Sequence, residues 1–148
     1  MSYITYINYG YGVCTDDLEQ YVNKETFARL VSLAPNYKES IKDFLENLED
    51  VPSFSDSDIY FDICNFDYSI AEVLAQVIRE TKNIEFTACS DFDDHHYLIF
   101  QPVYPWDRVS EAEKKLTTDK IEEIIYEYTS IFTKEKLVAD YQAVENGG

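Results

Sequence analysis

The chain has 148 residues, of which 45% are hydrophobic and 16% aromatic, so it can bury a core and is not expected to be disordered. Twelve basic residues against 29 acidic ones give a formal net charge of −17, which disfavours direct binding to nucleic acid or to an anionic membrane. No apolar run approaches the ~20 residues that span a bilayer, and the first residues lack the basic and apolar regions of a secretory signal.

The three cysteines, Cys14, Cys64 and Cys89, are widely spaced and form no Cys-x-x-Cys pair. An odd number of isolated cysteines is typical of reduced thiols in a cytoplasmic protein. Each cysteine lies in or beside an apolar stretch, which favours buried and unreactive side chains. The length fits a single acidic domain over residues 1–148, without a repeat or an internal linker.

The first predicted element is a strand. Residues 3–11 alternate in the period-two pattern of a β-strand and are rich in tyrosine and isoleucine. Gly10 and Gly12 indicate a bend or bulge, and we interpret them as a turn within a strand pair. The Tyr-Gly-Tyr-Gly run has neither the dinucleotide-binding nor the Walker spacing, so it does not predict a phosphate site.

Two helices are predicted next. Asn23 can cap a helix that runs to about Ala34. Pro35 ends that helix, and Asn36 can cap the second one. The second helix has an apolar side made of Tyr37, Ile41, Phe44, Leu45 and Leu48. Its opposite side is an acidic row made of Glu39, Asp43, Glu46 and Asp50. We therefore expect one continuous amphipathic helix.

A strand, a helix and a hairpin follow. A loop over residues 51–57 leads to a predicted strand at 58–63. Ser69 and Glu72 form a capping box that starts a helix to about Thr81. Residues 84–101 then have the pattern of a hairpin, with two apolar strands around an acidic turn. The strand–helix–strand crossover is expected to be right-handed if its two strands are parallel.

The last third of the chain is predicted to be mainly helical. Ser110 with Glu113 predicts a short helix, and Thr117 or Thr118 starts a longer one. We expect a final helical segment at 134–141 and a frayed tail over about 142–148. The elements together predict an α+β fold, with a small mixed β-sheet, a hairpin in the C-terminal half and helices packed mainly on one face.

The hairpin turn concentrates side chains that could bind a divalent metal, namely Asp91, Asp93, Asp94 and His96, with His95 beside them. A metal-dependent hydrolase or metal-binding protein is therefore one alternative. The EF-hand pattern is absent, and adjacent strand residues point to opposite faces, so His95 and His96 cannot both face one ion on a regular strand. The competing interpretation is a solvated turn whose aspartates bond to the backbone.

Other enzymatic signals are weak. No hydrolase signature motif is present, and no cofactor is expected. A nucleophilic pair of Cys89 with His95 or His96 is geometrically possible across the hairpin. However, no basic side chain nearby would lower the pKa of the thiol. The sequence therefore favours a protein without enzymatic activity.

The acidic side chains could instead form one face that imitates phosphates. The helical row places a carboxylate about every 5–6 Å, whereas one strand of a duplex carries a negative charge about every 3.4 Å. With the loop and the hairpin turn, the predicted partner-binding carboxylates are Glu39, Asp43, Glu46, Asp50, Asp56, Asp58, Asp91, Asp93 and Asp94. Such a face would occupy the groove of a basic or nucleic-acid-binding protein. The alternative is an ordinary solvated helix face.

Two aromatic residues complete the predicted partner-binding set. Tyr104 and Trp106 lie in a segment that Pro102 and Pro105 hold extended. They could anchor a protein interface, where tyrosine and tryptophan are enriched. A structural or regulatory subunit that docks a partner helix through them is a further alternative, as is a Trp106 that closes the end of the core. The oligomeric state is not predicted.

Short segments carry a resemblance to known proteins. Ile7-Asn8-Tyr9-Gly10-Tyr11-Gly12-Val13 and Tyr104-Pro105-Trp106, followed by Leu116-Thr117, resemble segments of small phage proteins of Gram-positive hosts. In size and acidity the chain is similar to phage anti-CRISPR and anti-restriction inhibitors, several of which imitate nucleic acid. This resemblance implies an inhibitor in the host cytosol that binds a Cas effector or a restriction enzyme, and it assigns no catalytic residue.

Overall fold

The computed structural model describes residues 5–49, 69–101 and 111–147. Its strands are β1 (Thr5–Cys14), β2 (Thr87–Ser90), β3 (His96–Phe100) and β4 (Asp140–Gly147). Its helices are the 3-10 helix η1 (Asp16–Tyr21), α1 (Lys24–Ser32), α2 (Pro35–Ser40), α3 (Lys42–Glu49), α5 (Ile70–Lys82), α6 (Glu111–Lys114) and α7 (Thr118–Thr129). The strands form one sheet in the order β2-β3-β1-β4, and each neighbouring pair is antiparallel. The α+β class is thus confirmed, while the described sheet is antiparallel rather than mixed.

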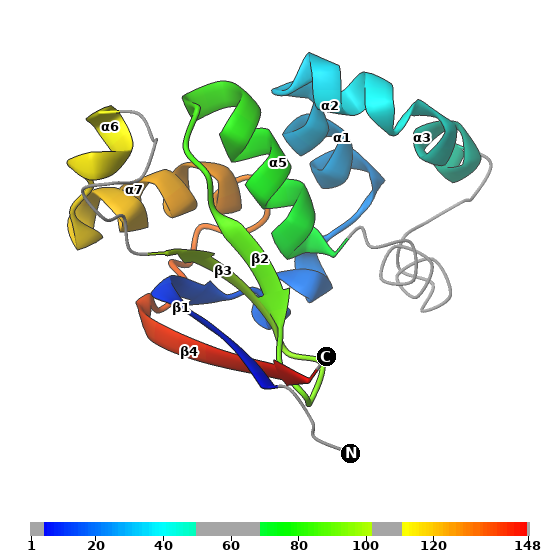
Figure 1. Cartoon of the computed structure of the whole chain (residues 1–148). Helices are drawn as coiled ribbons and strands as arrows, with labels where there is room; N and C mark the ends of the chain where they lie inside the picture. Colours follow the sequence, from blue (N-terminus) through cyan, green and yellow to red (C-terminus); the bar gives the residue numbers. More distant parts are fainter. Residues whose placement is uncertain (1–4, 50–68, 102–110, 148) are drawn as a thin grey trace.

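The helices lie on one side of the sheet, as predicted (Figure 1). The apolar residues of α5 and α7 are buried in the main core together with Val13, Leu98 and Phe100 from the strands. Burial of one such side chain contributes about 1.5–3 kcal/mol, so these two helices supply much of the stability. In the described part of the chain, every helix is too short or too polar to span a bilayer.

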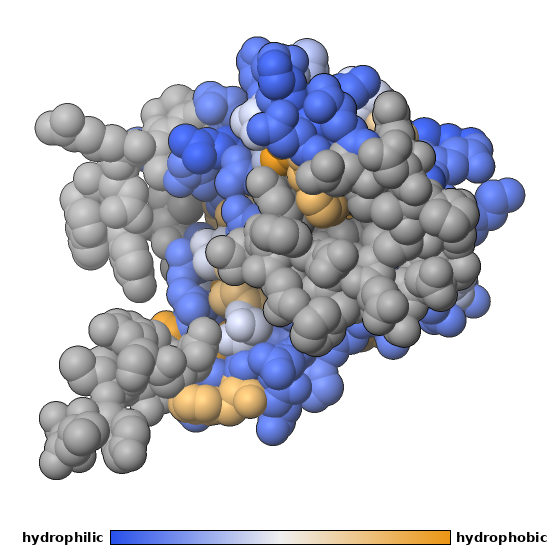
Figure 2. Space-filling view, turned by 90° about the vertical axis from the view of Figure 1, so that its right-hand side faces the viewer, coloured by the Kyte–Doolittle hydropathy of each residue, from blue (hydrophilic) through white to orange (hydrophobic). Residues whose placement is uncertain are grey.

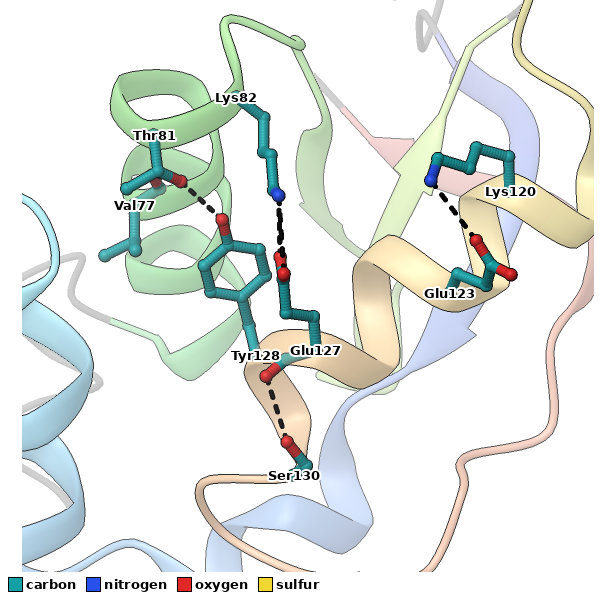
Figure 3. A network of polar contacts seen from close by, with 8 residues as sticks. All are labelled: Val77, Thr81, Lys82, Lys120, Glu123, Glu127, Tyr128 and Ser130. Carbon is teal, nitrogen blue, oxygen red and sulfur yellow. Dashed lines mark hydrogen bonds and ion pairs between the residues drawn. The ribbon is translucent and has the colours of Figure 1, made fainter.

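Polar contacts join α5 to α7 at the edge of this core (Figure 3). The hydroxyl groups of Thr81 and Tyr128 share a hydrogen bond of 2.5 Å, and Thr81 also donates to the carbonyl oxygen of Val77. Lys82 Nζ lies 3.1 Å from Glu127 Oε2 on the solvent side. The buried tyrosine hydroxyl therefore has a partner, as a buried polar group requires.

Strand β1 bends along its length, so that the ribbon of β1 and β4 folds beneath the rest of the sheet (Figure 1). The bend predicted at Gly10 and Gly12 is present, but the predicted turn is wrong because the strand runs unbroken through both glycines. A Cβ on Gly12 would lie 2.7 Å from Ile99 Cα and closer still to the carbonyl oxygen of Leu98. A Cβ on Gly10 would lie 2.6 Å from the carbonyl oxygen of Phe100. Close approach of β3 therefore explains both glycines.

The bend creates a second buried layer on the sheet face that points away from the helices. Ile99 pairs with Gly12, and Val144 pairs with Asn8, two positions on the same face of β1. Ile99 and Val144 are only 0% and 2% exposed, although neither belongs to the main core. Since Cα atoms of the edge strands β2 and β4 approach within 8 Å, the curled sheet covers these side chains itself.

The first predicted helix is confirmed, and the start of the second differs. Asn23 caps α1 by accepting the backbone N–H of Thr26 at 3.0 Å. Pro35 occupies the first turn of α2, so the predicted cap at Asn36 is wrong. Instead, Glu80 of α5 accepts the backbone N–H groups of Asn36 at 3.1 Å and Tyr37 at 2.8 Å. A carboxylate from another helix thus takes over the role of a local cap.

The predicted continuous helix after Pro35 is two helices, α2 and α3, separated at Ile41. Ile41 has φ −111° and ψ 20°, outside the helical region, and its side chain is 3% exposed. Burial of this side chain in the core takes precedence over an uninterrupted helix. The acidic row is consequently divided, with Glu39 on α2 and Asp43 and Glu46 on α3.

Within residues 69–101, the helix and the hairpin follow the predictions. The Ser69 hydroxyl accepts the N–H of Glu72 at the start of α5, and Asn83 ends the helix in the left-handed conformation. The hairpin is confirmed, although β2 begins at Thr87 rather than near residue 84. The strand predicted at 58–63 lies outside the described residues, and so does the proposed crossover. Ser110 is also outside them, whereas Glu113 of α6 accepts the N–H of Glu85 at 2.7 Å.

The prediction for the C-terminal end is wrong. Residues 134–139 form no helix, and the tail expected to fray over 142–148 forms strand β4 as far as Gly147. Eight residues of β4 pair with β1, from Asp140 opposite Gly12 to Gly147 opposite Thr5. Local composition could not show this, because the pairing partner lies more than a hundred residues away.

Candidate functional site

The turn between β2 and β3 packs against η1 and forms a strongly acidic surface. We call this surface the acidic tip and define it by Asp16, Asp17, Glu19, Asp91, Asp93 and Asp94. The two segments meet because the backbone N–H of Thr15 donates to the carbonyl oxygen of His96 at 2.8 Å. Residues 14–23 and 87–101 contain no lysine or arginine. Within these segments, only a protonated histidine can offset part of the negative charge of the tip.

Asp91 has a structural role within the turn. Its Oδ1 accepts the backbone N–H groups of Asp93 at 2.9 Å and His95 at 3.0 Å, and its Oδ2 accepts the Tyr97 hydroxyl at 3.4 Å. Partial desolvation acts to raise the pKa of Asp91, but the two backbone N–H bonds outweigh it and the pKa is lowered. Asp94 adopts the left-handed conformation, with φ 62°, that aspartate tolerates in tight turns. The interpretation of the turn as aspartates bonded to backbone fits this geometry.

His95 links the turn to η1. Its Nδ1 lies 2.6 Å from Asp16 Oδ2, and Asp16 Oδ1 accepts the backbone N–H of His96 at 3.0 Å. The bond to Asp16 raises the pKa of His95, and the nearby charge of Asp91 adds to the effect. One carboxylate thus holds two consecutive residues of the turn.

A pH-dependent contact follows from this pair. The pKa of His95 is raised above its ordinary value of 6.5. The stability that the protonated His95–Asp16 pair contributes is therefore complete below pH 6.5 and is lost as the pH rises through the folded-state pKa. We expect Asp16→Asn to lower the pKa of His95, measured by an NMR titration of the imidazole protons. Asp17→Asn removes the same charge without the bond and is expected to have a smaller effect. Equal effects of the two substitutions would contradict a specific pair.

The predicted metal ligands are not gathered into a site. Two oxygens of Asp91 are engaged by the turn, and no group of three or more His, Cys, Asp or Glu side chains within residues 5–49, 69–101 and 111–147 is arranged to hold a metal ion. His95 is directed to Asp16 rather than to Asp93 or Asp94. The described geometry therefore gives the metal alternative no ligand set.

Cys14 and Cys89 flank Tyr97 on one face of the sheet, since both pair with it. Cys64 lies outside the described residues. Burial, assisted by the charge of Asp91, raises the pKa of the Cys89 thiol to about 11. Burial also raises the pKa of Cys14. Both thiols are protonated at neutral pH, so the proposed pair of Cys89 with a histidine lacks a thiolate nucleophile.

The outer part of the acidic tip is accessible to a partner. Asp17, Asp93 and Asp94 are exposed. Between the carboxylates of the turn, the Phe92 side chain is 62% exposed. An exposed aromatic residue within a ring of charges is a typical anchor for a protein interface.

The predicted helical row lies elsewhere. Glu39, Asp43 and Glu46 are exposed on α2 and α3, well apart from the hairpin turn (Figure 1). The described surface on that side of the molecule is mostly hydrophilic, with small apolar areas (Figure 2). Lys42 lies 3.6 Å from Glu39 and places a positive charge within the row. Of the other predicted partner-binding residues, Asp50, Asp56, Asp58, Tyr104 and Trp106 lie outside the described residues.

Sequence reasoning missed the contribution of η1 to this site. Asp16, Asp17 and Glu19 were not among the predicted partner-binding residues, and neither was Phe92. The available signal was the absence of any lysine or arginine before Lys24, combined with three acids in a short segment. That signal could not show which other segment η1 meets in the fold.

Comparison with known proteins found no matching family model, no similar curated protein and no similar solved structure.

Proposed function

We propose that the protein is a non-enzymatic inhibitor that binds a basic, nucleic-acid-handling protein, with the acidic tip as its main contact. The supporting observation is that six carboxylates from two distant segments are joined by the Asp16 contacts, without a lysine or arginine in either segment. Carboxylates presented in this way can take the places of phosphates in a basic groove. Their charge also accelerates association by long-range attraction.

Phe92 gives the tip a component that phosphates lack. Its exposed ring can enter an apolar pocket and exclude water around the surrounding charge pairs. The raised thiol pKa of Cys89 and the absence of a metal-ligand set among the described residues give catalysis less support than binding. The resemblance to phage inhibitors makes Cas effectors and restriction enzymes of bacteria the first partners to test, and the cytosol the expected location.

The test is binding to a panel of purified Cas effectors and restriction enzymes by surface plasmon resonance, at low and at physiological salt. For a partner that binds, the triple variant Asp17→Asn, Asp93→Asn, Asp94→Asn is expected to lower the association rate constant by about 10-fold to 100-fold. The matched variant Glu39→Gln, Asp43→Asn, Glu46→Gln removes three charges from α2 and α3 and is expected to change it less than about threefold.

Three further results would decide the proposal. Added duplex or guide nucleic acid should compete with the protein for the partner. An equal decrease of the association rate constant in the two triple variants would show that the partner recognises net charge rather than the acidic tip. A panel that stays negative at low salt, where charge attraction is strongest, would remove the proposal itself.

A further inference from the structure

A groove separates α7 from the segment that leads into β4. It is open to solvent along one side and has a volume of about 800 Å³, within the usual range for ligand sites. The apolar residues of its lining are Val13, Ile125, Leu137, Val138 and Ala139. Its acidic residues are Asp119, Glu122, Glu123 and Glu127 of α7. The groove therefore combines an apolar surface with a row of carboxylates, and α7 lies apart from the acidic tip (Figure 1).

The charges of this row are only partly balanced. Lys120 Nζ lies 3.2 Å from Glu123, and Lys82 pairs with Glu127 (Figure 3). Glu122 instead accepts the hydroxyl of Tyr11, and this bond raises the pKa of the tyrosine to about 12. Asp119 has no ion-pair partner within the described residues. A negative potential thus remains along the groove.

The groove already binds one lysine side chain of its own chain. Lys136 Nζ lies 5.1 Å from the centroid of the Tyr126 ring, a cation–π arrangement, and both residues belong to the lining. Thr129, also in the lining, is 1% exposed, and its hydroxyl lacks a hydrogen-bond partner within the part of the chain that the structure describes. A buried polar group of this kind calls for an explanation, which a bound partner can supply.

The groove continues onto an exposed aromatic surface. The ring of Tyr11, whose hydroxyl bonds to Glu122, meets the Tyr141 ring in a T-shaped arrangement with the centroids 5.0 Å apart. The Tyr141 ring stacks with the Tyr9 ring, with the centroids 6.4 Å apart. Ile7, Tyr9 and Tyr141 are 59%, 49% and 60% exposed. Val13, Tyr11, Tyr9 and Ile7 are every second residue along one face of β1, about 6.4–6.8 Å apart. The same spacing separates every second side chain of an extended peptide.

We propose that the groove beside α7 and the tyrosines of β1 and β4 together bind an extended lysine-containing or arginine-containing segment of a partner protein. The cationic side chains contact the α7 carboxylates and the tyrosine rings, while the aliphatic parts of these side chains pack on Leu137, Val138 and Ala139. The site is separate from the acidic tip, so it stands whether or not the tip binds a nucleic-acid-handling protein.

The experiment uses the full chain and a fluorescein-labelled eight-residue peptide in which lysine and threonine alternate, with fluorescence anisotropy as the measurement. The double variant Asp119→Asn, Glu123→Gln is expected to weaken binding about tenfold, because both carboxylates border the groove. The matched variant Asp43→Asn, Glu46→Gln removes the same charge from α3 and is expected to change affinity less than about twofold. Circular dichroism of each variant is the control for folding.

A substitution that is expected to strengthen peptide binding gives a second readout. Lys136→Ala frees the Tyr126 ring for the peptide and is expected to tighten binding about threefold. Lys38→Ala, with the same change of net charge on α2, is expected to leave affinity nearly unchanged. A peptide of four lysines followed by four threonines should bind less tightly than the alternating one, because its charges do not match the spacing.

Several results would overturn this assignment. An equal loss of peptide affinity in the two double variants would show unspecific attraction to net charge. Equal affinity for the two peptides would show that the extended spacing is not recognised. Complete displacement of the alternating peptide by an equal concentration of spermidine would show that the groove binds free polyamines rather than a peptide.

Discussion

Replacing Gly12 by alanine is expected to lower the free energy of unfolding by about 3 kcal/mol, the upper end of the usual cost of overpacking. The added Cβ would lie 2.7 Å from Ile99 Cα and still closer to the Leu98 carbonyl oxygen. These are backbone atoms of β3, so no side-chain rotation can relieve the contact. Urea denaturation followed by tyrosine fluorescence and far-UV circular dichroism would measure the change.

Gly10→Ala provides a graded comparison for this prediction. Its Cβ would approach the Phe100 carbonyl oxygen at 2.6 Å, beyond the residues where β1 pairs with β3. We expect the free energy of unfolding to fall less than for Gly12→Ala, because the backbone at the end of the β1–β3 pairing can shift more easily. A Gly12→Ala protein within about 0.5 kcal/mol of the parent would contradict the close approach of β1 and β3.

The second large effect is expected at Val144. Val144→Asp would place a carboxylate where the side chain is 2% exposed, between the curled strands, and β4 contains no lysine or arginine that could pair with it. An unpaired buried charge costs about 3–5 kcal/mol, or forces the group to remain protonated. We therefore expect a loss of this size at neutral pH and partial recovery of stability in mild acid, measured by denaturation at both pH values.

Ala143→Asp is the matched control, because Ala143 is the adjacent exposed residue on the opposite face of β4. It makes the same change of charge and is expected to cost less than about 1 kcal/mol. If the C-terminal residues were a frayed tail, both substitutions would leave stability unchanged. A similar small effect at the two positions would therefore contradict the pairing of β4 with β1.

The helices that the sequence predicted well are those whose signals are local. Asn23, Ser69 and Thr117 each cap a helix through their own side chains, and the apolar residues of α5 and α7 recur every three or four positions. The hairpin was equally accessible, because its two strands and its aspartate-rich turn are adjacent in the chain. Such features depend on residues a few positions apart, so no knowledge of the fold is needed.

The errors share a different physical origin. The break at Ile41 arises from burial of one side chain, and the cap of α2 comes from Glu80 on another helix. Strand β4 exists because β1 offers it a complete pairing edge. In each case a contact between distant residues outweighs a local preference, and a single sequence does not contain the list of those contacts.

The candidate sites also depend partly on local sequence features and partly on contacts between distant segments. The sequence by itself determined the net charge of −17, the aspartate-rich hairpin turn and the amphipathic helices, because these follow from composition and short-range periodicity. Only the tertiary structure decided that η1 joins the turn through Asp16, and that the α7 carboxylates border a groove continuous with the tyrosines of β1 and β4. The physical reason is that these surfaces depend on which distant segments pair, and strand pairing and core packing select those partners.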